Sequence, residues 1–198
     1  MIKLWDLRYS KPEYAYGKEP NKYFEYAIKN LTPGKLLLPA EGEGRNAVYA
    51  AKKGWRVTAL DFSVQARDKA LKLARERKVK IDYIVSPIEK FVFPENEFDA
   101  AALIYAHFPP LQRVNIHNSV VNSLKSGGAL VIEAFSKKQI KNSTGGPKEL
   151  SLLYDLNDIL NDFKSMIIEV AIETETELSE GEYHKGKADI IRLIARKP

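Results

Sequence analysis

Cysteine is absent from this sequence of 198 residues. A chain without cysteine has no disulfide framework, no thiolate nucleophile and no metal site with cysteine ligands. Long apolar runs are missing as well, since no window approaches the ~20 apolar residues that a membrane-spanning helix needs. Residues 1–8 contain Lys3, Asp6 and Arg8 and therefore do not read as a secretory signal. We expect a cytoplasmic protein without a membrane anchor.

Strong charge of one sign is also missing. The 31 basic and 26 acidic side chains give a formal net charge of +5. Much of the basic excess lies in residues 67–80, where a helix would point its charges in several directions, so we interpret the segment as a solvated helix face. We accordingly expect no nucleic-acid groove. With 44% hydrophobic residues, the chain is long enough for one globular domain over residues 1–198.

An apolar run followed by a glycine-containing turn is the most informative feature present. Residues 35–44 read Lys-Leu-Leu-Leu-Pro-Ala-Glu-Gly-Glu-Gly, a helical pattern follows, and a second apolar run ends in Asp61. Strand, glycine turn, helix, strand and acid is the order found in nucleoside-binding βαβ units. Gly42 and Gly44 would let the backbone approach a ligand, and Asp61 would accept hydrogen bonds from ribose hydroxyls. The alternative is an ordinary turn in which the glycines only end the strand.

The remaining chain alternates between helical and extended patterns. Helices are predicted at residues 21–30, 46–53, 63–77 (with Ser63 as the cap), 112–124 and 150–161. Strands are predicted at residues 35–40, 56–60, 82–85, 97–105, 129–135, 163–177 and 188–196. The last two strands leave no room for a helix between them, so they must form an antiparallel hairpin. The pattern predicts a Rossmann-like, doubly wound α/β sheet of about seven strands that ends in this hairpin.

These motifs resemble those of class I S-adenosylmethionine-dependent methyltransferases, and among them the small enzymes similar to the tellurite-resistance and thiopurine methyltransferases. The resemblance is carried by Glu41-Gly42-Glu43-Gly44-Arg45-Asn46, Leu60-Asp61-Phe62-Ser63, residues 93–99, Leu124-Lys125-Ser126-Gly127-Gly128 and the C-terminal hairpin. It implies S-adenosylmethionine as cofactor, S-adenosylhomocysteine as product and in-line methyl transfer. The expected substrate contacts lie in short segments, namely residues 1–20 (the leader), residues 137–148 and the hairpin. A small-molecule methyl acceptor is therefore expected.

The resemblance also implies the residues of the cofactor site. They are Trp5, Arg8, Tyr9, Tyr16, Ala40, Glu41, Gly42, Asp61, Phe62, Ser63, Pro87, Ile88, Tyr105, Ala106 and His107. Residues 1–20 resemble the lid that these small enzymes fold over the cofactor. Aromatic faces of this leader would stabilise the sulfonium by roughly 0.5–2 kcal/mol of cation–π attraction. Arg8 would pair with the cofactor carboxylate or, alternatively, form a surface ion pair.

Three positions depart from the family pattern. Its first loop usually reads acid-x-Gly-x-Gly-x-Gly, whereas Leu38 replaces the acid and Ala40 replaces the first glycine. Alanine is a mild replacement if the φ angle of Ala40 is negative. Pro87 stands where the family often has an acid that binds the adenine amino group, so we expect apolar packing on the adenine and readout by the backbone of Ile88.

Candidate general bases are found among the three histidines. His107 follows the predicted strand 97–105 at the carboxyl edge of the sheet, and His184 lies in the hairpin turn. A neutral imidazole at either position would remove a proton from a thiol or hydroxyl acceptor. His117 lies within a predicted helix and is interpreted as structural. No histidine–carboxylate pattern typical of a metal site is present.

Other functional classes fit less well. The Asn/Asp-Pro-Pro-aromatic motif of amino-methylating nucleic-acid enzymes is missing, and cytosine-5 methylation requires a cysteine. A nicotinamide-dependent oxidoreductase would need a pair such as Tyr-x-x-x-Lys, but Tyr154 is followed four residues later by Asp158. A non-catalytic nucleoside-binding module remains an alternative, because Ala40 and Pro87 weaken the family motifs.

Overall fold

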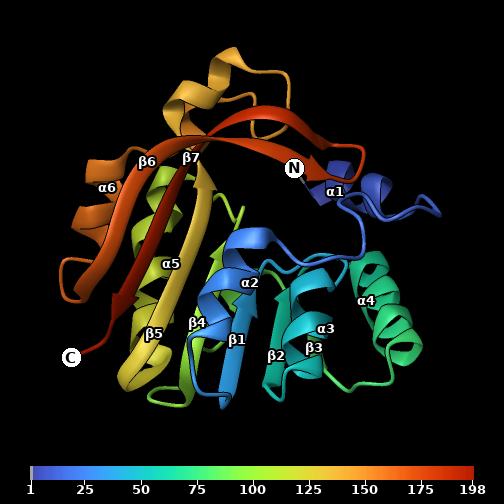
Figure 1. The fold of residues 1–198 in the computed structure, drawn as a ribbon, viewed down its shortest axis with the longest axis horizontal. Helices are drawn as coiled ribbons and strands as arrows, with labels where there is room; N and C mark the ends of the chain where they lie inside the picture. Colours follow the sequence, from blue (N-terminus) through green and yellow to red (C-terminus); the bar gives the residue numbers. More distant parts are fainter. Residues whose placement is uncertain (1) are drawn as a thin grey trace.

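The computed structural model describes residues 2–198, with side chains from Trp5 onward, and shows a seven-stranded sheet in the order β3-β2-β1-β4-β5-β7-β6 (Figure 1). The strands are β1 Lys35–Pro39, β2 Arg56–Asp61, β3 Asp82–Val85, β4 Phe98–Ile104, β5 Leu124–Phe135, β6 Ile167–Glu180 and β7 His184–Arg196. Strands β1 to β5 are parallel, whereas β7 is antiparallel to both β5 and β6. The predicted doubly wound sheet with a C-terminal antiparallel hairpin is confirmed.

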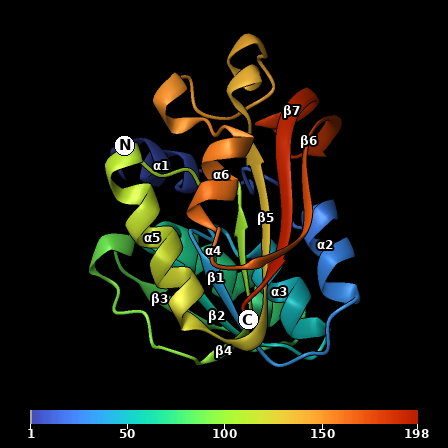
Figure 2. The same ribbon diagram turned by 90° about the vertical axis from the view of Figure 1, so that its left-hand side faces the viewer.

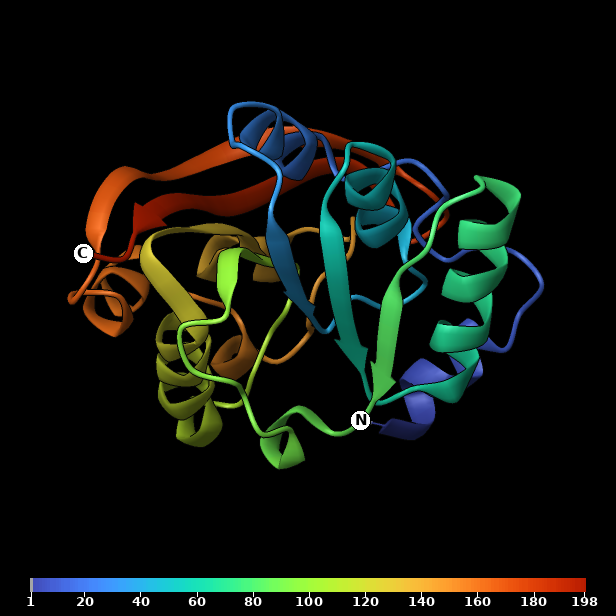
Figure 3. The ribbon, with the colours of Figure 1, turned by 90° about the horizontal axis from the view of Figure 1, so that it is seen from below.

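Helices cover both faces of this sheet. They are α1 Ile2–Tyr9, α2 Lys22–Lys29, α3 Arg45–Lys52, α4 Val64–Glu76, α5 Pro110–Ser123 and α6 Leu156–Asp162. Helices α2 and α3 lie on one side of the sheet and α5 and α6 on the other (Figures 2 and 3). Successive side chains of a strand point to opposite faces, so Leu36 and Leu38 of β1 join the cluster under α2 and α3, while Leu37 joins the cluster under α5 and α6. This explains why the central strands are almost wholly apolar.

Helix starts follow local capping chemistry. Ser63, the predicted cap, accepts a hydrogen bond from the amide of Ala66 at 3.2 Å and begins α4. Asn21 caps α2 in the same way, through a 2.8 Å bond from the amide of Phe24. Asp155 caps α6, so this helix begins at Leu156 and not at residue 150 as predicted; Leu150–Leu152 form a separate 3₁₀ turn.

Further predictions need correction. Residues 2–9 form helix α1 and Lys137–Lys141 form a 3₁₀ helix, where no regular elements were predicted. Strand β5 begins at Leu124 and not at residue 129: the pairing shifts from Phe98–Leu124 to Ala100–Ala129, so residues 125–128 lie in a bulge within the strand. Both hairpin strands extend further toward their turn than predicted: β6 spans Ile167–Glu180 instead of residues 163–177, and β7 spans His184–Arg196 instead of residues 188–196. They pair as far as Glu180 and His184, because polar residues such as threonine are well tolerated in an exposed β-ribbon.

The outer half of the hairpin lies over the carboxyl ends of the parallel strands. Pairing of β5 with β7 stops at Phe135–Ile190, and the hairpin continues beyond this point across the carboxyl ends of the parallel strands toward α1 (Figure 1). There it meets the leader, since Lys11 Nζ donates to Tyr183 Oη at 2.8 Å. Among the described residues, no helix is both long and apolar enough to cross a membrane.

Candidate functional site

Loops that follow four neighbouring strands lie side by side at the carboxyl edge of the sheet. Ala40 follows β1, Phe62 follows β2, Pro87 lies two residues after β3 and Tyr105 follows β4. These strands are adjacent in the order β3-β2-β1-β4, and the chain order reverses between β1 and β4. Open α/β sheets bind ligands at such a reversal. The structure therefore brings the expected cofactor residues that follow the strands to one edge.

The loop after β1 has an unusual backbone. Ala40, Gly42 and Gly44 all have positive φ angles, of 54°, 65° and 86°. The condition under which alanine would be a mild replacement, a negative φ angle at Ala40, is therefore not met, and a left-handed alanine costs roughly 1–2 kcal/mol. Hydrogen bonds hold this conformation, because the amide of Glu41 donates to the carbonyl of Leu60 at 3.1 Å.

The carboxylate of Glu41 lies at the N-terminus of α3. Its Oε1 accepts a 2.7 Å hydrogen bond from the amide of Ala47, in the first turn of the helix. Burial raises the pKa of Glu41 to about 7, although this bond and the helix terminus favour the charged form. Glu41 thus caps α3 through its side chain, while its backbone remains part of the loop.

Asp61 ends β2 and is tied to the glycine loop. Its Oδ2 accepts a 3.0 Å bond from the amide of Gly42, and its Oδ1 accepts a 3.0 Å bond from the amide of Ser63. Only 5% of the residue is exposed, and burial raises its pKa to about 6 against the effect of these donors. Tyr83 of β3 donates to the carbonyl of Gly42 at 2.6 Å, so three strands fix this loop.

The first half of the leader lies over the loop. Ser63 Oγ donates to Asp6 Oδ1 at 2.6 Å, and Tyr9 is 7% exposed. A Cβ atom built on Gly42 would lie 2.9 Å from the Tyr9 hydroxyl, which shows that Tyr9 covers this glycine directly. The ring of Tyr9 stacks on Trp5 with centroids 5.6 Å apart. Helix α1 therefore covers Gly42 and Ser63.

Arg8 has aromatic partners within the described part of the chain. Its Nη1 donates to Tyr16 Oη at 2.7 Å. The guanidinium carbon lies 4.7 Å from the Trp5 ring centroid and 4.2 Å from that of Tyr183. The guanidinium of Arg8 thus lies between the leader and the hairpin.

Polar contacts fasten the second half of the leader to α4. Lys69 Nζ donates to Glu43 Oε1 at 2.6 Å, and the amide of Ala15 donates to Glu43 Oε2 at 2.7 Å. Lys18 pairs with Glu76 and Arg77 with Glu19, each at 2.8 Å. The basic segment 67–80 is therefore not simply a solvated face, since Lys69 donates to the carbonyl of Glu13 and Arg77 pairs with Glu19, both in the leader.

A buried polar cluster, which the sequence did not reveal, lies beside this edge under the hairpin. It consists of Asn21, Arg45, Tyr105, Glu133, Glu180, His184 and Arg192, and we call it the Asn21 cluster. Asn21 Nδ2 donates to Glu133 Oε1 at 2.6 Å and to Glu180 Oε1 at 3.1 Å. Glu133 also accepts from Tyr105 at 2.8 Å and Arg192 at 2.6 Å. A lone glutamate in the apolar run of β5 was the one available signal in the sequence.

His184, one of the two expected bases, belongs to this cluster. It begins β7, is 4% exposed, and its Nδ1 lies 3.3 Å from Glu180 Oε2. The rings of Tyr16, Tyr105 and Phe135 surround it at centroid distances of 4.3, 4.6 and 5.3 Å. Burial lowers its pKa, so the imidazole is neutral near pH 7.

His107, the other expected base, has both ring nitrogens engaged by backbone groups. Its Nδ1 lies 2.8 Å from the carbonyl of Leu152, and its Nε2 accepts from the amide of Phe135 at 3.2 Å. Burial lowers its pKa to about 4. This geometry argues against the expected role of His107 as a general base, because no nitrogen is free to accept a proton, whereas packing of its ring on the cofactor stays a prediction. His117 contacts Asp162 at 2.9 Å inside the α5–α6 layer, in keeping with a structural role.

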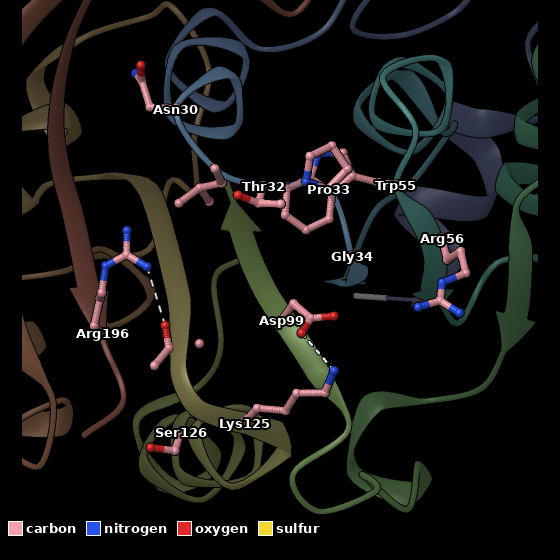
Figure 4. A pocket seen from close by; sticks show the side chains of 13 residues that line it. Asn30, Thr32, Pro33, Gly34, Trp55, Arg56, Asp99, Lys125, Ser126 and Arg196 are labelled. Atoms are coloured by element: carbon pink, nitrogen blue, oxygen red, sulfur yellow. Dashed lines mark hydrogen bonds and ion pairs between the residues drawn. The ribbon is translucent and has the colours of Figure 1, made fainter.

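A cavity of about 540 Å³ lies elsewhere, at the amino ends of the strands (Figure 4). Gly34, Arg56, Asp99 and Lys125 line it, and Lys125 pairs with Asp99 at 2.7 Å. Gly34 precedes β1 and Arg56 begins β2, so this cavity is at the sheet edge opposite Asp61. It takes no part in the site described above.

Comparison with known proteins places these features in a family context. Residues 39–128 match the family model described as a methyltransferase domain. Demethylmenaquinone methyltransferase of Renibacterium salmoninarum is 32% identical over 109 residues, which cover 52% of this chain and 43% of that protein. The enzyme of the same name from Paenarthrobacter aurescens is 30% identical over 102 residues, 52% of this chain and 39% of that protein. The chain thus matches less than half the length of these relatives.

Solved structures with the same fold cover most of the chain. TehB from Haemophilus influenzae has a TM-score of 0.75 at 18% identity, over 90% of this chain and 63% of that one. A SAM-dependent methyltransferase from Methanosarcina mazei gives 0.73 at 18% identity, over 90% and 98%. The [4+2]-cyclase SpnF gives 0.72 at 17% identity, over 100% and 92%. The likeness establishes the fold, and SpnF shows that this fold also serves an enzyme named for a different reaction.

Proposed function

We propose that this protein, which carries a methyltransferase domain in residues 39–128 and has the class I S-adenosylmethionine-dependent methyltransferase fold, transfers a methyl group to a small-molecule acceptor. The observation that carries the proposal is Asp61, held at the end of β2 by the amides of Gly42 and Ser63 within the matched domain. A small acceptor is supported by the short segments that meet at His184: the ring of Tyr16 in the leader lies 4.3 Å from its ring, centroid to centroid, and Gly145, within residues 137–148, lies against its edge.

The residues present fit the cofactor. At Gly42 the loop after β1 has no side chain and lies directly under Tyr9, so its backbone can approach a ligand once Tyr9 moves, and the carboxylate of Asp61 is suited to ribose hydroxyls. Phe62, Pro87 and Ile88 are partly exposed at the same edge and offer apolar contacts for an adenine ring. Bound S-adenosylmethionine would supply an activated methyl group on a sulfonium. The aromatic rings of Trp5, Tyr9 and Tyr16 would then exclude water and face this cation.

His184 is the group in this chain best suited to take the acceptor's proton. Its imidazole is neutral, buried among aromatic rings and oriented by a carboxylate on Nδ1. Proton removal matters for a hydroxyl or thiol acceptor, because the neutral group is a far weaker nucleophile than its anion. His184 and the surrounding rings would accordingly hold the acceptor in line and remove its proton.

Calorimetric titration tests the proposal directly. Binding of S-adenosylmethionine and S-adenosylhomocysteine, followed by release of S-adenosylhomocysteine in a screen of small acceptors, is the expected result. Binding without turnover for every acceptor class would support the non-catalytic module. Binding of NADH alone would support the oxidoreductase alternative. Either of these results, binding without turnover or binding of NADH alone, would contradict methyl transfer.

Asp61 makes the affinity for the cofactor product depend on pH. Asp61→Ala should weaken S-adenosylhomocysteine binding by roughly 1–3 kcal/mol, because a charged acceptor is lost. In the unaltered protein, affinity should fall about tenfold from pH 7 to pH 5 as the carboxylate, whose pKa is about 6, is protonated. Stability changes in the opposite sense: the folded state takes up this proton before the unfolded chain does, so protonation of Asp61 below about pH 6 contributes stability.

Asp61→Asn is the matched control for this pH dependence. It keeps the side-chain shape but has no proton to gain, so the affinity it retains should be constant over the same pH range. An equal pH dependence in Asp61→Asn would assign the titration to another group, and unchanged affinity in Asp61→Ala would remove Asp61 from the site.

We also propose that the leader acts as a lid, with α1 as its moving part. Helix α1 is held by the packing of Tyr9 on Ala66 and by the Asp6–Ser63 and Arg8–Tyr16 hydrogen bonds, without an ion pair to α4 among its described side chains. Residues 13–19, in contrast, are fastened to α4 and Glu43 by ion pairs and by a backbone hydrogen bond. Weakly held segments are the ones that open. Amide hydrogen exchange in residues 4–9 should slow markedly when S-adenosylhomocysteine is added, while residues 13–16 change little. Protection of the 40–46 loop without any change in residues 4–9 would refute the lid.

A further inference from the structure

Two buried carboxylates of the Asn21 cluster are held in different ways. Glu133 is 1% exposed and lies between Asn21, Tyr105 and Arg192. Glu180 is 9% exposed: its Oε1 accepts from Asn21, and its Oε2 accepts from Arg45 Nη2 at 2.9 Å and faces His184 Nδ1. Each carboxylate has a guanidinium partner, so neither is left as an uncompensated buried charge. Glu180 alone of the two touches the proposed base.

The surroundings of Glu180 leave it little freedom to move. Asn21 is itself fixed on three sides, because its amide donates to Asn46 Oδ1 at 2.9 Å while its side chain caps α2 and bridges Glu133 and Glu180. Arg45 is the first residue of α3, directly after the glycine loop, and its Nη1 also donates to the carbonyl of Tyr16 at 3.3 Å. The carboxylate of Glu180 is thus clamped between two helix starts.

This geometry has a chemical consequence for the imidazole. A neutral histidine carries its proton on one nitrogen only, and a carboxylate, which can only accept, stabilises the tautomer that points the proton at it. We propose that Glu180, clamped by Asn21 and Arg45, is a positioning residue that keeps the proton of His184 on Nδ1 and leaves Nε2 bare to receive the acceptor's proton. The inference rests on the proposed function, in which His184 is the base.

The opposite edge of the imidazole agrees with this assignment. A Cβ built on Gly145 would lie 2.7 Å from His184 Cδ2 and 3.2 Å from Nε2, so the bare nitrogen faces the backbone of the loop assigned to substrate contacts. The charged groups that act on the ring are Glu180 from β6, Arg45 from α3 and Arg8 from α1. Burial and the two guanidiniums keep the imidazole neutral, while Glu180 opposes them.

The proposal can be tested without knowing the acceptor. In long-range ¹H–¹⁵N spectra of ¹⁵N-histidine-labelled protein at pH 7, His184 should show a protonated Nδ1 and a bare Nε2. Observation of the Nε2–H form in the unaltered protein would overturn the inference on its own, whatever the variants do. His107, whose Nδ1 faces the carbonyl of Leu152, is the internal standard for an Nδ1–H ring.

Glu180→Gln is the decisive variant. Its amide cannot accept at both positions: one end would present NH₂ either to the Asn21 amide or to Arg45 and His184. The His184 proton should therefore shift to Nε2 or exchange between the two nitrogens, while the His107 signals stay in place. Glu182→Gln, an exposed residue of the same turn, is the matched control and should change nothing. Unchanged His184 signals in a folded Glu180→Gln protein would refute the positioning role.

Titration of the same samples with S-adenosylhomocysteine separates the two hypotheses. Binding within twofold of the unaltered protein, together with an altered His184 tautomer in Glu180→Gln, supports the inference. Absence of binding in the unaltered protein would defeat the proposed function itself. If Glu180→Gln does not fold, Glu180→Asp keeps the charge, and it should retain the Nδ1–H form.

Discussion

Replacing Gly44 with alanine should lower the free energy of unfolding by about 2–5 kcal/mol. The φ angle of this residue is 86°, and a Cβ built on it would lie 2.5 Å from the Cβ and 2.8 Å from the Cα of Ala70. Ala70 is completely buried in α4, and its backbone has no flexible end that could yield. Helices α3 and α4 would have to separate, which adds an overpacking cost of about 1–3 kcal/mol to the left-handed strain of about 1–2 kcal/mol.

Gly127→Ala provides the control for backbone strain alone. Its φ angle is 76°, but a Cβ there meets nothing within 4 Å, so only the strain of roughly 1–2 kcal/mol should appear. Urea denaturation of both variants measures the difference between them. Equal losses would mean that the close approach of α3 to α4 does not limit stability.

Gly42→Val should reduce the affinity for S-adenosylhomocysteine at least about a hundredfold while the protein stays folded. A β-branched residue is strongly disfavoured at the φ angle of 65° found here, so the loop would change shape where its amide now binds Asp61. The added side chain would also meet the Tyr9 hydroxyl at 2.9 Å, at the flexible end of that side chain. Displacing Tyr9 costs less than displacing backbone, so the loss falls mainly on binding.

Calorimetry and circular dichroism on matched variants distinguish the causes. Gly42→Ala combined with Tyr9→Phe removes the hydroxyl contact and keeps the backbone strain. If this double variant binds normally, the collision with Tyr9 governs affinity; if it binds as weakly as Gly42→Val, the loop conformation does. Normal binding by a folded Gly42→Val protein would reduce the loop to an ordinary turn.

Local patterns in the sequence predicted the strand–turn–helix–strand unit that carries the glycine loop and Asp61. These residues lie within 25 positions of each other, and the hydrogen bond between Gly42 and Asp61 spans 19 of them. The sequence left the sign of the φ angle of Ala40 open, because this angle is imposed from outside the loop, in part by the bond from the amide of Glu41 to β2. Alanine's own preference would give the opposite sign.

The Asn21 cluster, in contrast, depends on residues that are distant in sequence. Asn21 reaches Glu133 and Glu180, which are 112 and 159 residues away, and no periodicity records such a contact. A polar residue before a helix reads only as a cap, and Asn21 is indeed one. The two histidines expected as bases looked alike in sequence, and only the partners of their nitrogens distinguish them.

The position of β7 has a consequence for how the chain matures. Strand β7 follows β5 and β6 in the chain but lies between them in the sheet, and it is the strand on which β6 pairs. Until residues 184–196 have left the ribosome, β5 is therefore an open edge and β6 has no strand to join, although both are already complete. His184 and Arg192 arrive on that same strand, so the glycine loop and Asp61 can form earlier in synthesis, whereas the Asn21 cluster with the proposed base assembles only after β7 has been made.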